Sequence, residues 1–106
     1  MPFNPKEIGR YADVATSYIT KEDMERLALF AEEGTRLPII VMEYPEGFWL
    51  RVNLAEVLDE DLAEWRKAGL SEALCNLVRA ASAENITYLK IDADGGDHDG
   101  FPTFDW

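Results

Sequence analysis

The stretch from Leu37 to Val52 constrains the fold more than any other part of the sequence. It begins with an almost unbroken apolar run, Leu37 to Glu43, which is rich in β-branched residues and too short for a typical helix, so it indicates a buried strand. The turn sequence YPEG follows, and a second strand is predicted from Phe48 to Val52. Its alternation predicts one face with Phe48, Leu50 and Val52 and another with Trp49 and Arg51. The two strands should pair as a hairpin, so the fold contains a β-sheet.

Two other segments carry the signals of capped helices. The hydroxyl of Thr20 can accept a hydrogen bond from the backbone N–H of Asp23, whose carboxylate can reach back, and this capping box predicts a helix from Lys21 to Glu33 that ends at Gly34. A second helix should start at Ser71 and end at Asn85. The inner faces are predicted to carry Met24, Leu27, Ala28 and Ala31 in the first helix, and Leu70, Leu74, Leu77, Val78 and Ala81 in the second.

The remaining segments complete the order of elements. Strands are predicted from Ala12 to Tyr18 and from Ile86 to Ile91, and the terminal FPTFDW is expected to return as a short strand. Asn53 is predicted to cap a further helical stretch that stops at Gly69. This is the split β-α-β order, so we predict a two-layer α+β sandwich with helices on one face of a mostly antiparallel sheet, and the ferredoxin-like strand order is favoured. We expect a single domain over residues 1–106, with residues 1–10 as a loosely held N-terminal arm.

The chain is strongly acidic. It has 21 acidic and 10 basic residues, a formal net charge of -11, of which residues 1–53 contribute -3 and residues 54–106 contribute -8. This charge disfavours direct contact with nucleic acid or anionic lipid, and it favours a partner protein with a basic surface. The single cysteine, Cys75, precludes an internal disulfide, and we see neither a signal-type leader nor an apolar run long enough to span a membrane. We therefore expect a cytoplasmic protein.

The segment IDADGGDHDG, residues 91–100, contains four aspartates, the only histidine and three glycines. An EF-hand loop that started at Asp92 would have Gly96 at position five and Thr103 at position twelve, so that match fails. A nonstandard divalent-cation site remains an alternative to a solvated turn between two strands. Its ligands would be Asp92, Asp94, Asp97 and Asp99.

No stretch of the sequence carries a catalytic signature. His98 lies among glycines and aspartates without a positioned partner, and we interpret it as a local charge neutraliser. Cys75 has no histidine near it in sequence and is expected to be a small buried residue. We therefore predict that the protein is not an enzyme, has no cofactor and has no assigned metal site.

The helical stretch before Gly69 is predicted to carry a row of carboxylates. Glu56, Glu60 and Glu64 are four residues apart and would line one helix face. Like charges in that register cost roughly a few tenths of a kcal/mol per pair, so local helix stability does not explain them. We interpret the row as part of a partner-binding surface, against the alternative of a solvated face that keeps the protein soluble. The surface would also include Asp59, Asp61, Asp92, Asp94, Asp97 and Asp99.

The chain has three tryptophans, which are typical anchors of protein interfaces. Trp65 lies beside Glu64 and is interpreted as an anchor, with a core position as the alternative. Trp106 is assigned to the same partner-binding surface, against a position folded back onto the domain. Trp49 is expected to pack on Arg51 or under a helix.

Four blocks of the chain, ITKEDMERLALFAEE, PIIVMEYPEGFWLRV, AGLSEALCNLVRAA and the ending YLKIDADGG to FPTFDW, resemble a family of short acidic proteins of unknown function from bacteria, their phages and other mobile elements. The resemblance covers Tyr11 to Trp106, and no catalytic residue carries over from it. It implies a mobile-element context, in which small acidic proteins often act against host proteins that handle nucleic acid.

Three functional hypotheses follow. In the first, an acidic, DNA-mimic-like surface binds the basic cleft of a nucleic-acid-handling host protein and inhibits or modulates it. In the second, the chain is a general interaction module with incidental charge, including a homodimer formed through the sheet edge or the Trp49 face. In the third, it is a metal-binding domain built on residues 92–99.

Overall fold

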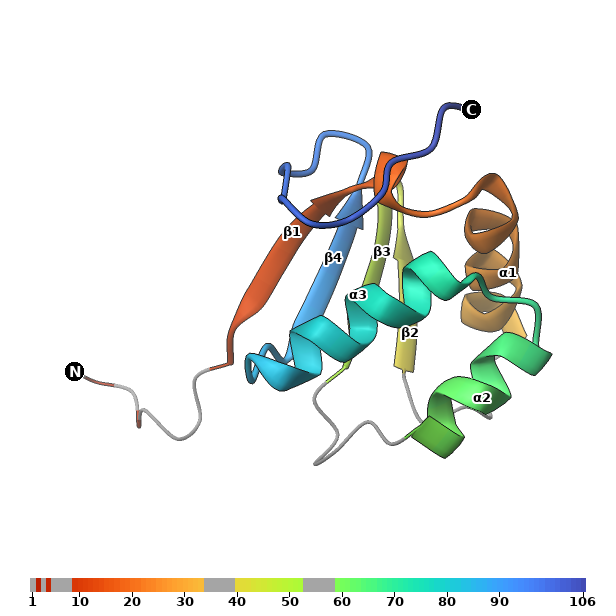
Figure 1. Cartoon of the computed structure of the whole chain (residues 1–106). Coiled ribbons are helices and arrows are strands. Elements are labelled where there is room, and N and C mark those ends of the chain that lie inside the picture. The colour runs from red at the N-terminus through yellow and green to blue at the C-terminus, as the bar shows by residue number, and fades with distance from the viewer. Residues whose placement is uncertain (1, 3, 5–8, 34–39, 53–58) are drawn as a thin grey trace.

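A computed structural model describes residues 2, 4, 9–33, 40–52 and 59–106, with the backbone alone at residues 40 and 59–61. One four-stranded sheet has the spatial order β1-β4-β3-β2 (Figure 1). β1 pairs with β4 in parallel, and the other two pairings are antiparallel. The strands are β1 (Tyr11–Ala15), β2 (Ile40–Tyr44), β3 (Gly47–Arg51) and β4 (Tyr88–Asp92). The helices are α1 (Lys21–Glu33), α2 (Asp59–Lys67) and α3 (Glu72–Ala83), and a 3₁₀ turn, η2 (Thr16–Tyr18), follows β1.

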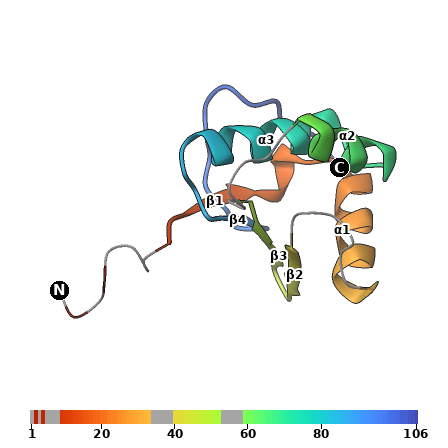
Figure 2. The same cartoon turned by 90° about the horizontal axis from the view of Figure 1, so that it is seen from below.

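The helices gather on one side of the sheet. α3 lies across one face, α1 stands beside β2, and no described helix covers the opposite face (Figure 2). The predicted two-layer α+β class with a mostly antiparallel sheet is therefore confirmed, since two of the three strand pairings are antiparallel and only β1 and β4 pair in parallel. The ferredoxin-like strand order is not confirmed, because that order puts the first strand between the third and the fourth, whereas here β4 lies between β1 and β3.

The predicted hairpin is present. Tyr44 pairs with Gly47 across a two-residue turn formed by Pro45 and Glu46. β2 was expected at Leu37 to Glu43, and it runs to Tyr44, while residues 37–39 of that prediction lie outside the described residues. The alternation in the second strand is confirmed, since Phe48, Leu50 and Val52 are buried whereas Arg51 is exposed and Trp49 only partly buried.

Both capped helices form as predicted. The Asp23 N–H donates to Thr20 Oγ1 at 3.0 Å, and the Thr20 N–H donates to Asp23 Oδ2 at 3.0 Å, which is the capping box. Ser71 caps α3 by accepting a hydrogen bond from the Leu74 N–H. Asn85, with φ of 56°, follows the last turn of α3 in the left-handed conformation that ends helices. The predicted caps Gly34 and Asn53 lie outside the described residues.

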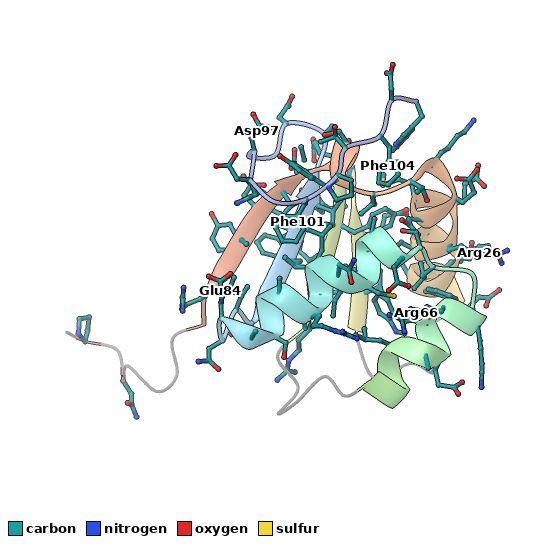
Figure 3. The ribbon with its side chains drawn as sticks, in the orientation of Figure 1. Arg26, Arg66, Glu84, Asp97, Phe101 and Phe104 are labelled. Atoms are coloured by element: carbon teal, nitrogen blue, oxygen red, sulfur yellow. The ribbon has the colours of Figure 1, made fainter. Side chains whose placement is uncertain are left out.

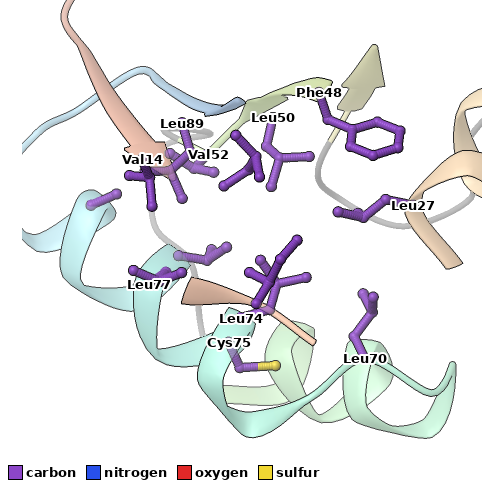
Figure 4. Packing of buried hydrophobic residues seen from close by; sticks show 14 of the residues in the cluster. Val14, Leu27, Phe48, Leu50, Val52, Leu70, Leu74, Cys75, Leu77 and Leu89 are labelled. Carbon is purple, nitrogen blue, oxygen red and sulfur yellow. The ribbon is translucent and has the colours of Figure 1, made fainter. Parts of the chain in front are cut away.

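The core fills the space between the sheet and the helices (Figure 4). Leu74 and Leu77 of α3 face Leu89 and Val52 of the sheet, and Cys75 is buried as predicted. Trp65 of α2 is the largest side chain with no exposed surface. Burial of this many apolar side chains supplies the main force that holds the helical layer on the sheet.

Two predicted strands need correction. The first strand was expected to reach Tyr18, but the chain leaves the sheet after Ala15 and turns through η2. The terminal FPTFDW forms no strand. It lies against η2 instead, where the Phe104 N–H donates to the Ser17 carbonyl at 2.7 Å and the Trp106 indole N–H donates to the Ile19 carbonyl at 3.0 Å. These partners belong to a turn, so they cannot extend a strand ladder.

Candidate functional site

The uncovered face of the sheet carries a cluster of aromatic side chains. The register places Tyr11 beside Tyr88, and Trp49 beside Lys90, on this face. The rings of Tyr11 and Trp49 meet edge to face with centroids 5.3 Å apart, and those of Trp49 and Tyr88 do so at 5.9 Å. The Lys90 ammonium lies 5.7 Å from the Trp49 ring centroid, within reach of a cation–π interaction. The three rings and Lys90 form the aromatic patch.

The aromatic patch is open to solvent. Tyr11 is 58% exposed, and Met42, next to Trp49 on β2, is 44% exposed. Together they border a shallow pocket of about 440 Å³, whose lining residues are Gly9, Arg10, Tyr11, Met42, Trp49 and Tyr88. Large apolar side chains gathered on an uncovered face are typical of surfaces that bind other macromolecules.

A charged group anchors the end of this face. Asp92 is almost completely buried, and its carboxylate accepts hydrogen bonds from the Tyr44 hydroxyl and, at 2.7 Å, from the Asp94 N–H. The Lys90 ammonium lies 3.8 Å from Asp92 Oδ2. The Tyr44 hydrogen bond is the main cause that lowers the pKa of Asp92, and the Asp94 N–H and Lys90 add to it. Burial and the bond to Asp92 raise the pKa of Tyr44. Asp92 is therefore ionised at neutral pH, and its carboxylate holds the Tyr44 hydroxyl and the Asp94 N–H in place.

Tyr44→Phe is expected to change how the stability of the domain depends on pH. Because the pKa of Asp92 is lower in the folded state than in the unfolded chain, its stabilising effect is complete above about pH 4–5 and is lost as the pH falls through the folded value. The variant should be less stable than the wild type at pH 7, and the difference should shrink as the pH falls through the lowered pKa of Asp92. Urea unfolding between pH 7 and pH 2 measures this.

The matched control for this experiment is Tyr88→Phe. It removes a hydroxyl from the same face, and within the described residues that hydroxyl makes no hydrogen bond. Its stability should stay parallel to that of the wild type at every pH. A constant difference between Tyr44→Phe and wild type from pH 7 to pH 2 would show that Asp92 is not the titrating group.

The aspartate- and glycine-rich segment packs on β1. The Ala15 N–H donates to the Gly96 carbonyl at 3.1 Å, and His98 Nε2 lies 2.7 Å from the Asp13 carbonyl oxygen. The Tyr18 hydroxyl donates to the His98 carbonyl and accepts from the His98 N–H. A β-carbon on Gly95 would lie 2.4 Å from the Val14 carbonyl, so this close approach requires glycine. The segment is solvated as predicted, because Asp94, Asp97 and Asp99 are exposed. The prediction that it joins two strands was wrong, because no strand follows it and it folds back onto the edge of β1.

The four aspartates of this segment do not converge. Asp94, Asp97 and Asp99 are exposed, whereas Asp92 turns inward to Tyr44. Within the described ranges, no three carboxylate, imidazole or thiol side chains come together as a metal site. The geometry therefore gives no support to the cation-binding alternative, and it argues against Asp92 as a contact residue.

The predicted carboxylate row is only partly visible. Glu56 lies outside the described residues, as do the side chains of Asp59, Glu60 and Asp61 on α2. Glu64 is exposed, and one of its oxygens lies 3.4 Å from the Lys67 ammonium. α2 lies at one end of the molecule and the loop that carries Asp97 at the other (Figures 1 and 3). The structure therefore does not bring the two acidic segments together.

The three tryptophans do not all lie where the sequence placed them. Trp65 has no exposed surface, so the alternative core position holds and it is not a contact residue. Trp106 is 54% exposed, although its indole N–H is bonded to Ile19. Trp49 lies on the sheet face that no described helix covers, and Lys90 rather than Arg51 packs on its ring. The sequence reasoning overlooked Tyr11, Met42 and Tyr88, whose signal was their placement on the non-core side of three strands.

The fold and the open aromatic patch define a small α+β domain with a surface suited to macromolecular contact. The chain belongs to the family of unknown function DUF5983, whose C-terminal domain matches residues 11–106. Neither a curated protein nor a solved structure shows a significant match. Among the described helices, none is long and apolar enough to cross a membrane.

Proposed function

We propose that the domain is a non-enzymatic protein-binding module whose contact surface is the aromatic patch. The observation that carries the proposal is the exposure of Tyr11 and Met42 beside Trp49 on a sheet face without a covering helix. Leaving such side chains in water costs roughly 25 cal/mol for each Å² of apolar surface, and a partner would remove that cost. Aromatic side chains at the centre of an interface are also those that contribute most to binding.

Charge supports a partner with a basic surface. A net charge of -11 attracts positively charged proteins over a range set by the salt concentration, and it makes association fast at low salt. Lys90 and Arg51 place positive charge on the uncovered face itself, so the attraction to a basic partner comes from the acidic residues on the rest of the molecule. We infer that the overall charge steers the partner, whereas the aromatic patch provides the affinity.

A second candidate function is DNA mimicry against a nucleic-acid-handling host protein, in the mobile-element setting that the resemblance implies. It is favoured by the exposure of Asp94, Asp97 and Asp99 on one loop. In that case the carboxylates of this loop, and not the aromatic patch, would provide the affinity, and binding would weaken steeply with salt.

Copurification with the tagged full chain from its native host separates the two. We expect Tyr11→Ser with Met42→Ser to reduce recovery of the partner at least tenfold, because both side chains are exposed and contribute little to the core. Leu29→Ser is the matched control, since Leu29 is 46% exposed on α1 and outside the patch. If the double variant keeps the partner while Asp94→Asn, Asp97→Asn and Asp99→Asn together release it, the mimic is supported and the aromatic-patch proposal fails.

A further inference from the structure

The outer edge of β1 is only partly paired. Neighbouring residues of a strand direct their backbone groups to opposite edges. The Tyr88 N–H donates to the Arg10 carbonyl, so Ala12 and Val14 pair with β4, and Tyr11, Asp13 and Ala15 point outward. The loop occupies the Ala15 N–H and the Asp13 carbonyl. Within the part of the chain that the structure describes, the Tyr11 carbonyl and the Asp13 N–H face away from β4 and make no hydrogen bond with the loop.

A groove of about 440 Å³ runs beside this edge, between β1 and α3. Leu77 and the small residues Ala80 and Ala81 of α3 form one wall, and Val14 and Leu89 lie on the sheet side. Phe101 of the C-terminal tail also belongs to the lining. An open strand edge next to an apolar groove is the arrangement that extended peptides use when they add a strand to a sheet.

The charges around the groove are mostly negative. Asp13 and Glu84 belong to its lining, and Asp97 lies next to the lining residues Gly96 and His98. Arg10 is the opposing charge in the lining, and its guanidinium donates to the Glu84 carbonyl at 2.9 Å. With a net charge of -11 for the whole chain, this surface complements a peptide with basic side chains.

We propose that the edge of β1 binds an extended segment of a partner protein in which apolar and basic residues alternate. The segment runs parallel to β1, so that one of its residues donates its N–H to the Tyr11 carbonyl and accepts from the Asp13 N–H. The same parallel pattern already exists at the other edge of β1, where the Tyr88 N–H donates to the Arg10 carbonyl. This edge adjoins the aromatic patch, because Tyr11 gives its ring to the patch and its backbone carbonyl to the edge, but the inference does not depend on the function proposed for the patch.

The geometry places the apolar side chains of the peptide in the groove and its basic side chains on the uncovered face of the sheet. Ala12 faces the helical layer, and a peptide residue aligned with Ala12 has its side chain on the same side, in the groove. The apolar residues of the bound segment are therefore the ones whose backbone N–H groups face β1. The basic residues in between lie on the uncovered face beside Asp13, and their N–H groups point away.

A second copy of the chain fits this edge poorly. In a symmetric dimer built on two β1 edges, Asp13, Glu84 and Asp97 of one copy would lie close to the same residues of the other. Two molecules with a charge of -11 each would also repel one another. A basic peptide meets neither obstacle.

The test uses the full chain and a fluorescent peptide of about eight residues that alternates lysine and leucine, with binding followed by fluorescence anisotropy. We expect a Kd below about 100 μM, which corresponds to roughly 5.5 kcal/mol of binding free energy. Methylating the leucine amides should weaken binding at least tenfold, because those amides face β1. Methylating the lysine amides should change it less than threefold, although the charge and the number of methyl groups are the same.

Matched protein variants locate the site. Ala80→Arg places a long basic side chain in the groove and should weaken binding at least tenfold, whereas Ala83→Arg makes the same charge change on α3 outside the groove and should have less than a threefold effect. The proposal is overturned if no binding occurs, if both methylated peptides bind alike, if the lysine amides matter instead, or if the two arginine variants behave alike. Concentration-dependent dimerisation that Ala80→Arg abolishes would assign the groove to a second copy and would also overturn it.

Discussion

Asp23→Ala is expected to lower the free energy of unfolding by about 3 kcal/mol, a large fraction of the stability of a domain of this size. Asp23 is completely buried and links the first turns of two helices. Its carboxylate accepts hydrogen bonds from the Thr20 N–H at 3.0 Å, from the Ser71 N–H at 2.7 Å and from the Ser71 hydroxyl at 2.5 Å. Alanine would leave the partly buried Thr20 and Ser71 donors without partners and would remove one of the two hydrogen bonds of the capping box of α1.

Two further variants test this explanation by chemical or thermal unfolding. Asp23→Asn keeps the shape and one acceptor oxygen, so it should recover part of the lost stability. Glu22→Ala removes a neighbouring carboxylate that is exposed on α1, and it should change the free energy of unfolding by less than about 0.5 kcal/mol. If Asp23→Ala unfolds like the wild type, the carboxylate does not hold the two helix starts together.

Gly47→Ala should destabilise the domain by roughly 3 kcal/mol or more, or prevent folding altogether. Gly47 begins β3 beside β4, and a β-carbon there would lie 1.8 Å from the carbonyl oxygen of Ile91. The obstacle is backbone, so it cannot move aside as a flexible side chain could. Relief requires β3 and β4 to separate at that end, which would disrupt the pairing of Gly47 with Asp92.

Gly100→Ala is the informative comparison for Gly47. Gly100 has φ of 90°, but no atom lies within 4 Å of a β-carbon placed there. Gly100→Ala should therefore lower the free energy of unfolding by only about 1 kcal/mol, from backbone strain alone. Urea unfolding of both variants separates steric from conformational causes, and similar losses of stability in the two would refute the steric explanation for Gly47.

The elements that the sequence predicted well are those decided by neighbouring residues. The capping box of Thr20 and Asp23, the alternation of β3 and the helical spacing of α3 are all local, and the structure confirms them. The strand order is decided by contacts between distant segments, and β4 could pair with β1 or leave it without any change in local pattern. This is why the order of the sheet was not obtained from the sequence.

The candidate site was harder to predict for the same reason. Trp49 stands between the apolar residues Phe48 and Leu50, whereas Trp65 stands between the charged residues Glu64 and Arg66. These neighbours suggest the opposite of what the structure shows, since Trp49 lies on the uncovered face and Trp65 in the core. The aromatic patch joins Tyr11, Trp49 and Tyr88 from three strands, so it exists only once the register is known. The carboxyl group of Asp92 was read as exposed because its partner, Tyr44, is 48 positions away in the sequence.

The pairing of the first strand with the last has a consequence for synthesis on the ribosome. Among the strands that the structure describes, β1 lies at the edge of the sheet and pairs with β4 alone, and Tyr11 and Tyr88 are 77 positions apart. The hairpin and α1 can form as the nascent chain emerges, but the sheet cannot close until β4 has left the exit tunnel. Until then β1 has no strand to pair with, and its apolar side chains stay exposed. A chain arrested before Tyr88 should therefore be held by chaperones or degraded.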